Sequence, residues 1–138
     1  MILFVDDEEE MDSYRMGLEL SGHEVVLITK LDEAWNYFNS NLDRMELVIL
    51  DISMPPGKFL EDYDTKAGLR TGVVFYDKLR EIAPSLPIII FTNVSDEKVR
   101  LRFDEVKNCL FLNKTDELPS TLAERVGEML PRSVRTGQ

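Results

Sequence analysis

Five short apolar runs recur along the chain, and longer stretches with helical spacing separate them. The runs are rich in Val, Ile, Leu and Phe and lie at residues 2–5, 24–28, 46–51, 87–92 and 109–112. An unbroken run of this kind is typical of a strand buried on both faces, as in parallel sheets. We therefore interpret the runs as five strands of one sheet.

The stretches between the runs place apolar residues on one helical face. The predicted inward positions are Met11, Tyr14 and Leu18; Leu31, Ala34, Trp35, Phe38 and Leu42; Phe75, Leu79 and Ile82; Val99, Phe103 and Val106; and Leu118, Leu122, Val126 and Met129. Gly22 is expected to close the first helix, while Thr29 with Asp32, and then Ser95, are expected to start the second and fourth. Strand and helix alternate five times, which predicts an α/β domain with helices on both faces of a parallel sheet.

Residues 56–71 show neither the unbroken apolar run of a buried strand nor the spacing of a helix. Glycine and proline punctuate this stretch, which indicates a long loop. It holds four large apolar residues that should pack on the domain or meet a partner: Phe59, Leu60, Tyr63 and Leu69. We expect the loop to cover the sheet edge beside residue 51, although an insertion folded onto the surface without function is the alternative.

Length and composition limit the classes of function. The 138 residues suit one domain over residues 1–130, followed by a polar tail at 131–138. A net charge of −10, from 16 basic and 26 acidic residues, repels phosphate backbones and anionic lipids, so neither nucleic acid nor a membrane is expected as a partner. The apolar residues at the start of the chain are followed at once by acidic residues, which is unlike a signal peptide. We therefore expect a cytoplasmic protein. A single cysteine, Cys109, excludes an internal disulfide and a thiolate metal cluster.

Polar residues stand where four of the apolar runs stop. Asp6 and Asp7 follow the first run, Asp51 ends the third, Thr92 ends the fourth, and Lys114 follows the fifth. Right-handed crossovers bring the carboxyl ends of parallel strands to one edge of a sheet. These groups are therefore expected to converge.

Three carboxylates at one edge repel one another unless a cation compensates them. Oxygen ligands without histidine or thiolate select a hard ion, and Mg²⁺ is the usual one in phosphoryl chemistry. Asp51 is the natural nucleophile because it projects from a central strand, whereas Asp6 and Asp7 are better spaced to share a metal and its waters. Lys114 adds a positive charge and Thr92 a hydroxyl donor, which together suit phosphoryl transfer.

At these positions the chain resembles the receiver domain of two-component response regulators. The resemblance rests on the pair Asp6-Asp7, on Asp51 followed by x-x-Met-Pro, on Thr92 and on Lys114, over about residues 1–130. It implies a doubly wound, flavodoxin-like sheet of five parallel strands in the order 2-1-3-4-5. Two features depart from the pattern: a threonine follows Lys114 in place of proline, and residues 56–71 form a longer stretch than receivers usually carry.

The resemblance also implies a metal site. Mg²⁺ would be held by Asp7, Asp51 and the main-chain carbonyl of Ser53, with Asp6 acting partly through water. The resemblance implies that Mg²⁺ is the cofactor and that the domain is a phosphoacceptor and not an enzyme. At most it labels itself from small phosphodonors and slowly loses the phosphoryl group again.

The implied reaction is a step of a phosphorelay. Asp51 would take a phosphoryl group from a histidine kinase or a histidine phosphotransfer protein, and the domain would then signal to an unidentified downstream protein. Thr92 would turn towards the phosphoryl oxygens, and the aromatic residue of the fifth strand, Phe111, would move inward with it. Lys114 would pair with the phosphoryl group, so its removal is expected to leave the fold and metal binding intact.

Three other functions fit parts of the sequence. Residues 113–116 (Asn-Lys-Thr-Asp) match the N-K-x-D pattern that reads guanine in GTP-binding proteins, but acids follow the first strand where those proteins have a glycine-rich phosphate loop. An aspartate-nucleophile phosphatase would need a second acid two residues after Asp51, where Ser53 stands. A pseudo-receiver, which binds partners without being phosphorylated, is the remaining alternative.

Overall fold

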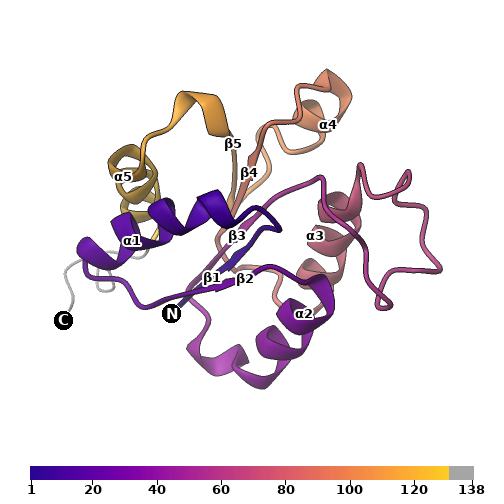
Figure 1. Ribbon diagram of the computed structural model, residues 1–138, viewed down its shortest axis with the longest axis horizontal. Helices are drawn as coiled ribbons and strands as arrows, with labels where there is room; N and C mark the ends of the chain where they lie inside the picture. Colours follow the sequence, from indigo (N-terminus) through magenta and orange to yellow (C-terminus); the bar gives the residue numbers. More distant parts are fainter. Residues whose placement is uncertain (131–138) are drawn as a thin grey trace.

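The protein folds as an α/β domain with one central sheet and a layer of helices on each face (Figure 1). The computed structural model describes residues 1–130, so the predicted tail at 131–138 lies outside the described residues. All five strands are parallel and lie in the order β2-β1-β3-β4-β5, which confirms the predicted topology. The strands are β1 (Ile2–Val5), β2 (Val25–Ile28), β3 (Leu47–Leu50), β4 (Ile88–Thr92) and β5 (Cys109–Asn113).

The unbroken apolar runs are explained by burial on both faces of the sheet. Every residue of β1, β3 and β4 is buried. Alternate residues of a strand point to opposite faces, so Leu3 and Val5 enter one core while Ile2 and Phe4 enter the other. Neither face meets water, and no polar residue is needed until the strand ends.

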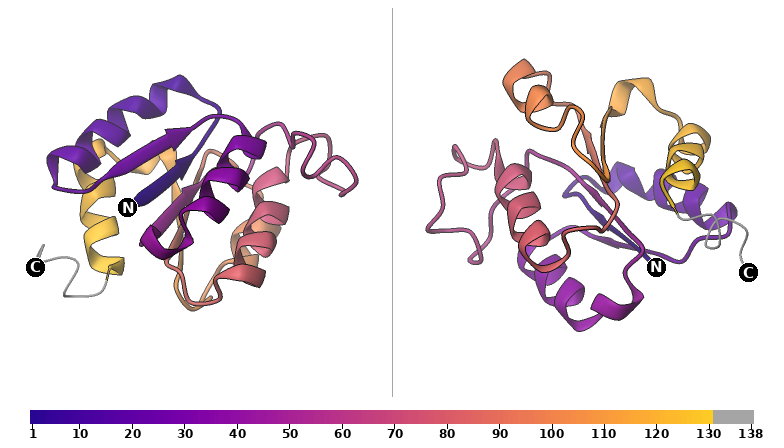
Figure 2. Two further views of the ribbon diagram at one scale, coloured as in Figure 1. Left: turned by 90° about the horizontal axis from the view of Figure 1, so that it is seen from below. Right: turned by 180° about the vertical axis from the view of Figure 1, so that it is seen from behind.

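The helices divide between the two faces of the sheet, as Figure 2 shows. Residues of α1 (Asp12–Leu20) and α5 (Pro119–Met129) pack in one core, and residues of α2 (Leu31–Ser40), α3 (Thr71–Ile82) and α4 (Glu97–Arg102) pack in the other. Three single turns of 3₁₀ helix complete the structure: η1 (Glu9–Met11), η2 (Leu42–Arg44) and η3 (Lys114–Asp116). Among the described residues, none of the helices combines the length and the apolar character needed to cross a bilayer.

Three predicted inward positions are wrong because the residues are exposed, and a fourth lies outside the helix predicted for it. Leu42 is exposed in η2, past the end of α2, and Ile82 is the exposed last residue of α3. Leu118 is the exposed residue before α5. Val106 is half-buried, but it follows the end of α4 at Arg102 and so is not on that helix. A spacing of three or four residues places a side chain on the inner face only while the helix continues.

The predicted helix ends are right for α1 and one residue off for α4. Gly22 follows the last turn of α1 with φ of 95° and donates its N–H to the carbonyl of Glu19, which is the expected C-terminal cap. Asp96, and not Ser95, caps α4, because its carboxylate accepts the N–H of Lys98.

The helix-start box predicted for Thr29 and Asp32 does not form. The residue before α2 is Lys30, and it makes no side-chain cap. Asp32 instead accepts the backbone N–H groups of Lys58 at 2.9 Å and Phe59 at 2.8 Å. A residue in the first turn of α2 therefore holds the long loop that follows β3.

That loop, residues 51–70, contains neither helix nor strand, as predicted for 56–71, and it extends beside α3 (Figure 1). Leu60 is fully buried, and the ring of Phe59 stacks on Trp35 with centroids 4.4 Å apart. Tyr63 and Leu69 are exposed. The prediction that the apolar residues pack on the domain is thus confirmed for the first two. For Tyr63 and Leu69, contact with a partner stays a prediction.

Candidate functional site

A pocket of about 420 Å³ opens at the carboxyl edge of the sheet. It lies where β1, β3 and β4 end, which is the usual position of ligand sites in open α/β sheets. Its lining residues are Asp7, Glu8, Asp51, Ser53, Thr92, Asn93 and Val94. Four of the residues singled out from the sequence therefore face one cavity.

Lys114 links the acidic residues of this edge. Its ammonium nitrogen lies 2.7 Å from Oδ2 of Asp6, 3.1 Å from Oδ2 of Asp51 and 3.1 Å from Oε1 of Glu8. Lys114 is only 7 % exposed, Asp51 3 % and Asp6 0 %. Buried charges persist only when they are paired, so the fold depends on this cluster being neutralised.

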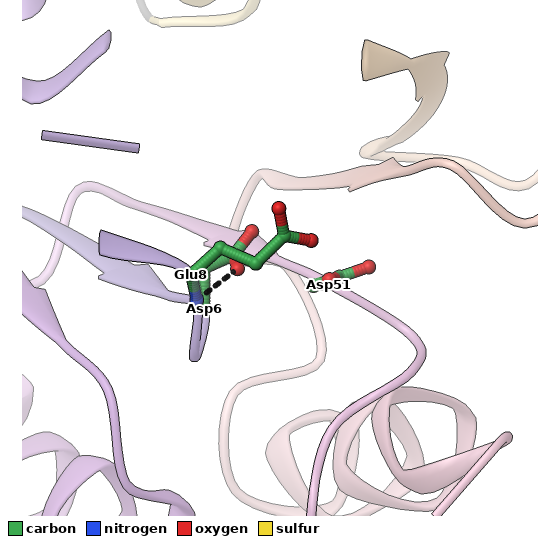
Figure 3. Close-up of side chains that lie close together, drawn as sticks. All are labelled: Asp6, Glu8 and Asp51. Carbon is green, nitrogen blue, oxygen red and sulfur yellow. Dashed lines mark hydrogen bonds between the residues drawn. The ribbon is translucent and has the colours of Figure 1, made fainter. Parts of the chain in front are cut away.

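Local backbone hydrogen bonds position the carboxylates. Asp6 comes directly after β1, and its Oδ1 accepts the N–H of Glu8 at 3.0 Å, which turns Glu8 back over the strand end. Asp51 follows β3, where its N–H donates to the carbonyl of Val5 and its Oδ1 accepts the N–H of Ile52. Figure 3 shows the carboxylates of Asp6, Glu8 and Asp51 gathered at one place.

Glu8 is the acidic residue that sequence reasoning missed. One oxygen each from Asp6, Glu8 and Asp51 lies within 4.8 Å of the others, whereas Asp7 is an exposed residue on the pocket wall. The run of acids from residue 6 to 10 was a signal that more than two carboxylates could contribute. The turn after Asp6 decides which of these acidic residues lies beside Asp6 and Asp51, and that residue is Glu8.

The remaining predicted residues lie at different depths. Ser53 is half-buried on the pocket wall, and Thr92 is fully buried with its hydroxyl oxygen accepting the N–H of Val94 at 3.2 Å. Phe111 is half-buried on β5 and does not line the pocket. Its ring stacks on Phe103 with centroids 6.2 Å apart.

Burial and mutual repulsion shift the proton affinities of the cluster. Burial raises the pKa of Asp6 to about 6, and the contact with Lys114 offsets only part of this effect. Burial also raises the pKa of Asp7, with a smaller contribution from the Asp51 carboxylate. For Lys114, burial lowers the pKa, but the pairing with Asp6 and Asp51 outweighs it and the pKa lies above its ordinary value. The site therefore favours additional positive charge.

The donor atoms fit a hard divalent cation. The clustered ligands are carboxylate oxygens, whereas His23 and Cys109 lie at the amino-terminal ends of β2 and β5, the opposite edge of the sheet. Oδ2 of Asp6 is buried and, within the described residues, accepts no hydrogen bond of good geometry despite its closeness to Lys114. Such an oxygen has a free lone pair for a metal, and oxygen-only sites suit Mg²⁺.

A family model described as response regulator receiver domain matches residues 2–126. The chain belongs to this family. The receiver and the receiver domain protein from Clostridium thermocellum superpose with a TM-score of 0.74 and 24 % identity, covering 96 % and 94 % of the two chains. The Francisella response regulator 1452 receiver domain superposes with a TM-score of 0.72 and 19 % identity, covering 96 % of this chain and 97 % of that one. The receiver domain of the hybrid histidine kinase CckA superposes with a TM-score of 0.68 and 25 % identity, covering 94 % of this chain and 98 % of that one. No curated protein matches the sequence.

The structure gives no support to guanine recognition by residues 113–116. The ammonium of Lys114 is buried against carboxylates, and the side chain of Asn113 accepts the N–H and hydroxyl of Thr115 to cap η3. Neither group is directed to a base. The peptide bond between Lys114 and Thr115 is trans, like the others in residues 1–130.

Replacing Asp6 by asparagine should stabilise the metal-free receiver above pH 6. The pKa of Asp6 is about 6 in the fold against 3.8 for the free side chain, so the folded state binds the proton more tightly. The contribution of Asp6 to parent stability then falls as the pH rises from about 4 to about 6, by about 3 kcal/mol in total. Urea unfolding with a chelator at several pH values should show the advantage of Asp6→Asn growing over this window. A constant difference would contradict the raised pKa.

Proposed function

We propose that this receiver accepts a phosphoryl group on Asp51 in a Mg²⁺-dependent step of a two-component phosphorelay. The observation that carries the proposal is the position of Asp51. Its carboxylate ends a central strand, faces the pocket, contacts Lys114 and shares an oxygen cluster with Asp6 and Glu8. These groups supply a nucleophile, a fixed cation and a metal site within one cavity.

The chemistry is a displacement at phosphorus. A carboxylate oxygen of Asp51 forms the new O–P bond, while the bond from phosphorus to the nitrogen of a donor histidine breaks and the imidazole leaves. Asp6, Asp51, Ser53 through its main-chain carbonyl, and either Asp7 or Glu8 would hold Mg²⁺, which neutralises charge on the phosphoryl oxygens. Asp51 must be ionised and free of a blocking contact for this attack.

Lys114 and Thr92 would stabilise the product. The ammonium of Lys114 already lies 3.1 Å from Oδ2 of Asp51, so a small movement would pair it with a phosphoryl oxygen. The hydroxyl of Thr92 would donate to another oxygen in place of its present contact with the N–H of Val94. Phe111, whose ring now stacks on Phe103, would then move inward.

The expected phosphoryl donor is a histidine kinase or a histidine phosphotransfer protein. A further protein is expected to bind the domain downstream. The resemblance at 25 % identity to the receiver of a hybrid histidine kinase supports the donor class. The acidic net charge of −10 argues against a direct nucleic-acid partner. The cytoplasmic setting expected from the sequence belongs to the same proposal.

Intact-mass measurement after incubation with acetyl phosphate tests the proposal. With Mg²⁺ the parent should gain the mass of one phosphoryl group, and with a chelator it should gain none. Asp51→Asn should remain unlabelled, while Asp43→Asn, at an exposed position in η2, should be labelled like the parent. A parent that gains no mass with Mg²⁺ is a pseudo-receiver, and labelling of Asp51→Asn as fast as the parent would assign the wrong nucleophile.

A further inference from the structure

The end of the long loop returns along the segment that carries Asp51. The N–H of Met54 donates to the carbonyl of Gly68 at 3.0 Å, and the N–H of Gly72 donates to the carbonyl of Ile52 at 2.8 Å. Ser53, whose carbonyl is an expected metal ligand, lies between these two bonds. We call residues 65–72 the return segment and residues 51–54 the phosphoacceptor segment.

The return segment contains a left-handed turn. Lys66, Ala67 and Gly68 have φ of 54°, 57° and 90°, a conformation that costs about 1–2 kcal/mol for each non-glycine residue. Two buried threonines hold it: Thr65 Oγ1 accepts the N–H of Gly68, and Thr71 Oγ1 donates to the carbonyl of Gly68, both at 3.3 Å. Strain kept by buried polar contacts indicates a constraint that the rest of the structure imposes.

The two segments are in close backbone contact. A Cβ on Gly68 would lie 3.2 Å from the carbonyl oxygen of Met54, and one on Gly72 would lie 2.1 Å from the carbonyl oxygen of Asp51. No side chain separates the segments at these points. The position of the return segment therefore determines the position of the phosphoacceptor segment.

The return segment is itself fixed to neighbouring elements. Arg70 pairs with Asp96, the cap of α4, at 2.7 Å. The earlier part of the loop is held on α2 by Asp32 and by the stacking of Phe59 on Trp35. The loop is thus attached at both ends and is not a free flap.

The loop does not form the cover that we expected from the sequence. No residue of 56–71 is among those that line the acidic pocket, and the loop lies beside α3 (Figure 1). Beside the site, the loop contacts main-chain atoms of the phosphoacceptor segment, through Gly68 at Met54. Its effect on the site must be exerted through that main chain.

We infer that residues 65–72 are a positioning element that holds the carboxylate of Asp51 and the carbonyl of Ser53 where Mg²⁺ binding and phosphoryl transfer require them. The inference rests on the proposed function of Asp51. Gly68 and the threonines that hold it are positioning residues, because none of them is among the residues that line the acidic pocket. Loss of such outer contacts typically weakens a metal site by about tenfold or more.

Gly68→Ala and Gly22→Ala form a matched pair for the test. Both glycines have φ near 90°, so both substitutions impose left-handed strain, but a Cβ on Gly22 meets nothing within 4 Å. Both variants should lose stability in urea, and Gly68→Ala should lose more because its Cβ would lie 3.2 Å from the carbonyl oxygen of Met54. Only Gly68→Ala should weaken Mg²⁺ binding, by about tenfold in a titration followed by amide chemical shifts. In metal-free protein, only this variant should show faster hydrogen exchange at the amide of Met54.

The outcomes separate the two proposals. If the parent binds Mg²⁺ and both variants match its affinity and its Met54 exchange, the positioning role is overturned while the proposed function stands. A parent that neither binds Mg²⁺ nor gains mass overturns both. Should Gly68→Ala fail to fold, Thr65→Val removes the acceptor of the Gly68 N–H with little change in shape, and it must show the same loss of affinity and protection.

Discussion

Gly72→Ala should destabilise the receiver by about 3 kcal/mol or more, a large part of the stability of a domain of this size. The added Cβ would lie 2.1 Å from the carbonyl oxygen of Asp51 and 2.6 Å from Cα of Ile52. Both are backbone atoms, which cannot rotate away as the end of a side chain can. Relief requires α3 to move off the end of β3, which would also break the bond from the Gly72 N–H to Ile52.

Gly127→Ala provides the control for this prediction. Gly127 lies inside α5, and a Cβ there would meet nothing within 4 Å. Alanine in a helix interior is favoured over glycine by about 0.5–1 kcal/mol, so this variant should be slightly more stable than the parent. Urea midpoints of the two variants should move in opposite directions. Parent-like stability of Gly72→Ala would show that α3 and the end of β3 are less tightly packed than the structure describes.

Lys114→Ala should cost about 3–5 kcal/mol in the absence of divalent cations, the usual effect of removing one partner from a buried ion pair. Asp6 and Asp51 would remain buried, and the nearby Glu8 carboxylate would add to their repulsion. The sequence alone led us to expect an intact fold for this variant. The structure changes that prediction because the ammonium of Lys114 is paired with the buried carboxylates of Asp6 and Asp51.

Mg²⁺ and a second substitution should each recover the loss. A cation bound only by the folded state adds about 2.7 kcal/mol at a hundredfold excess over its Kd, and the variant should bind it more tightly than the parent does. Lys114→Ala combined with Asp6→Asn should regain much of the stability without metal. Lys107→Ala, at an exposed position, should stay within about 0.5 kcal/mol of the parent. Equal stability of Lys114→Ala and parent in a chelator at pH 7.5 would refute the dependence on this ion pair.

The strands and their polar ends were predictable because both follow from local pattern. A strand buried on both faces is apolar along its length, so the first polar residue after each run marks the edge of the sheet. Asp6, Asp51 and Thr92 mark it in this way, although all three are themselves buried. Helix ends were less predictable. Ile82 and Leu118 keep the apolar spacing, but the helix ends beside them, and capping hydrogen bonds rather than hydrophobicity decide that end.

By itself the sequence determined the parallel α/β topology, the edge that carries the acidic residues and the family, because hydrophobic period and strand-end chemistry are properties of neighbouring residues. Only the tertiary structure decided that Glu8 joins Asp6 and Asp51, and that Asp32 holds the loop 26 residues away at Lys58. It also decided that the loop contributes none of the residues that line the pocket. Each of these depends on contacts between groups brought together by folding. Such contacts leave no period in the sequence, since one hydrogen bond or one close backbone approach fixes them.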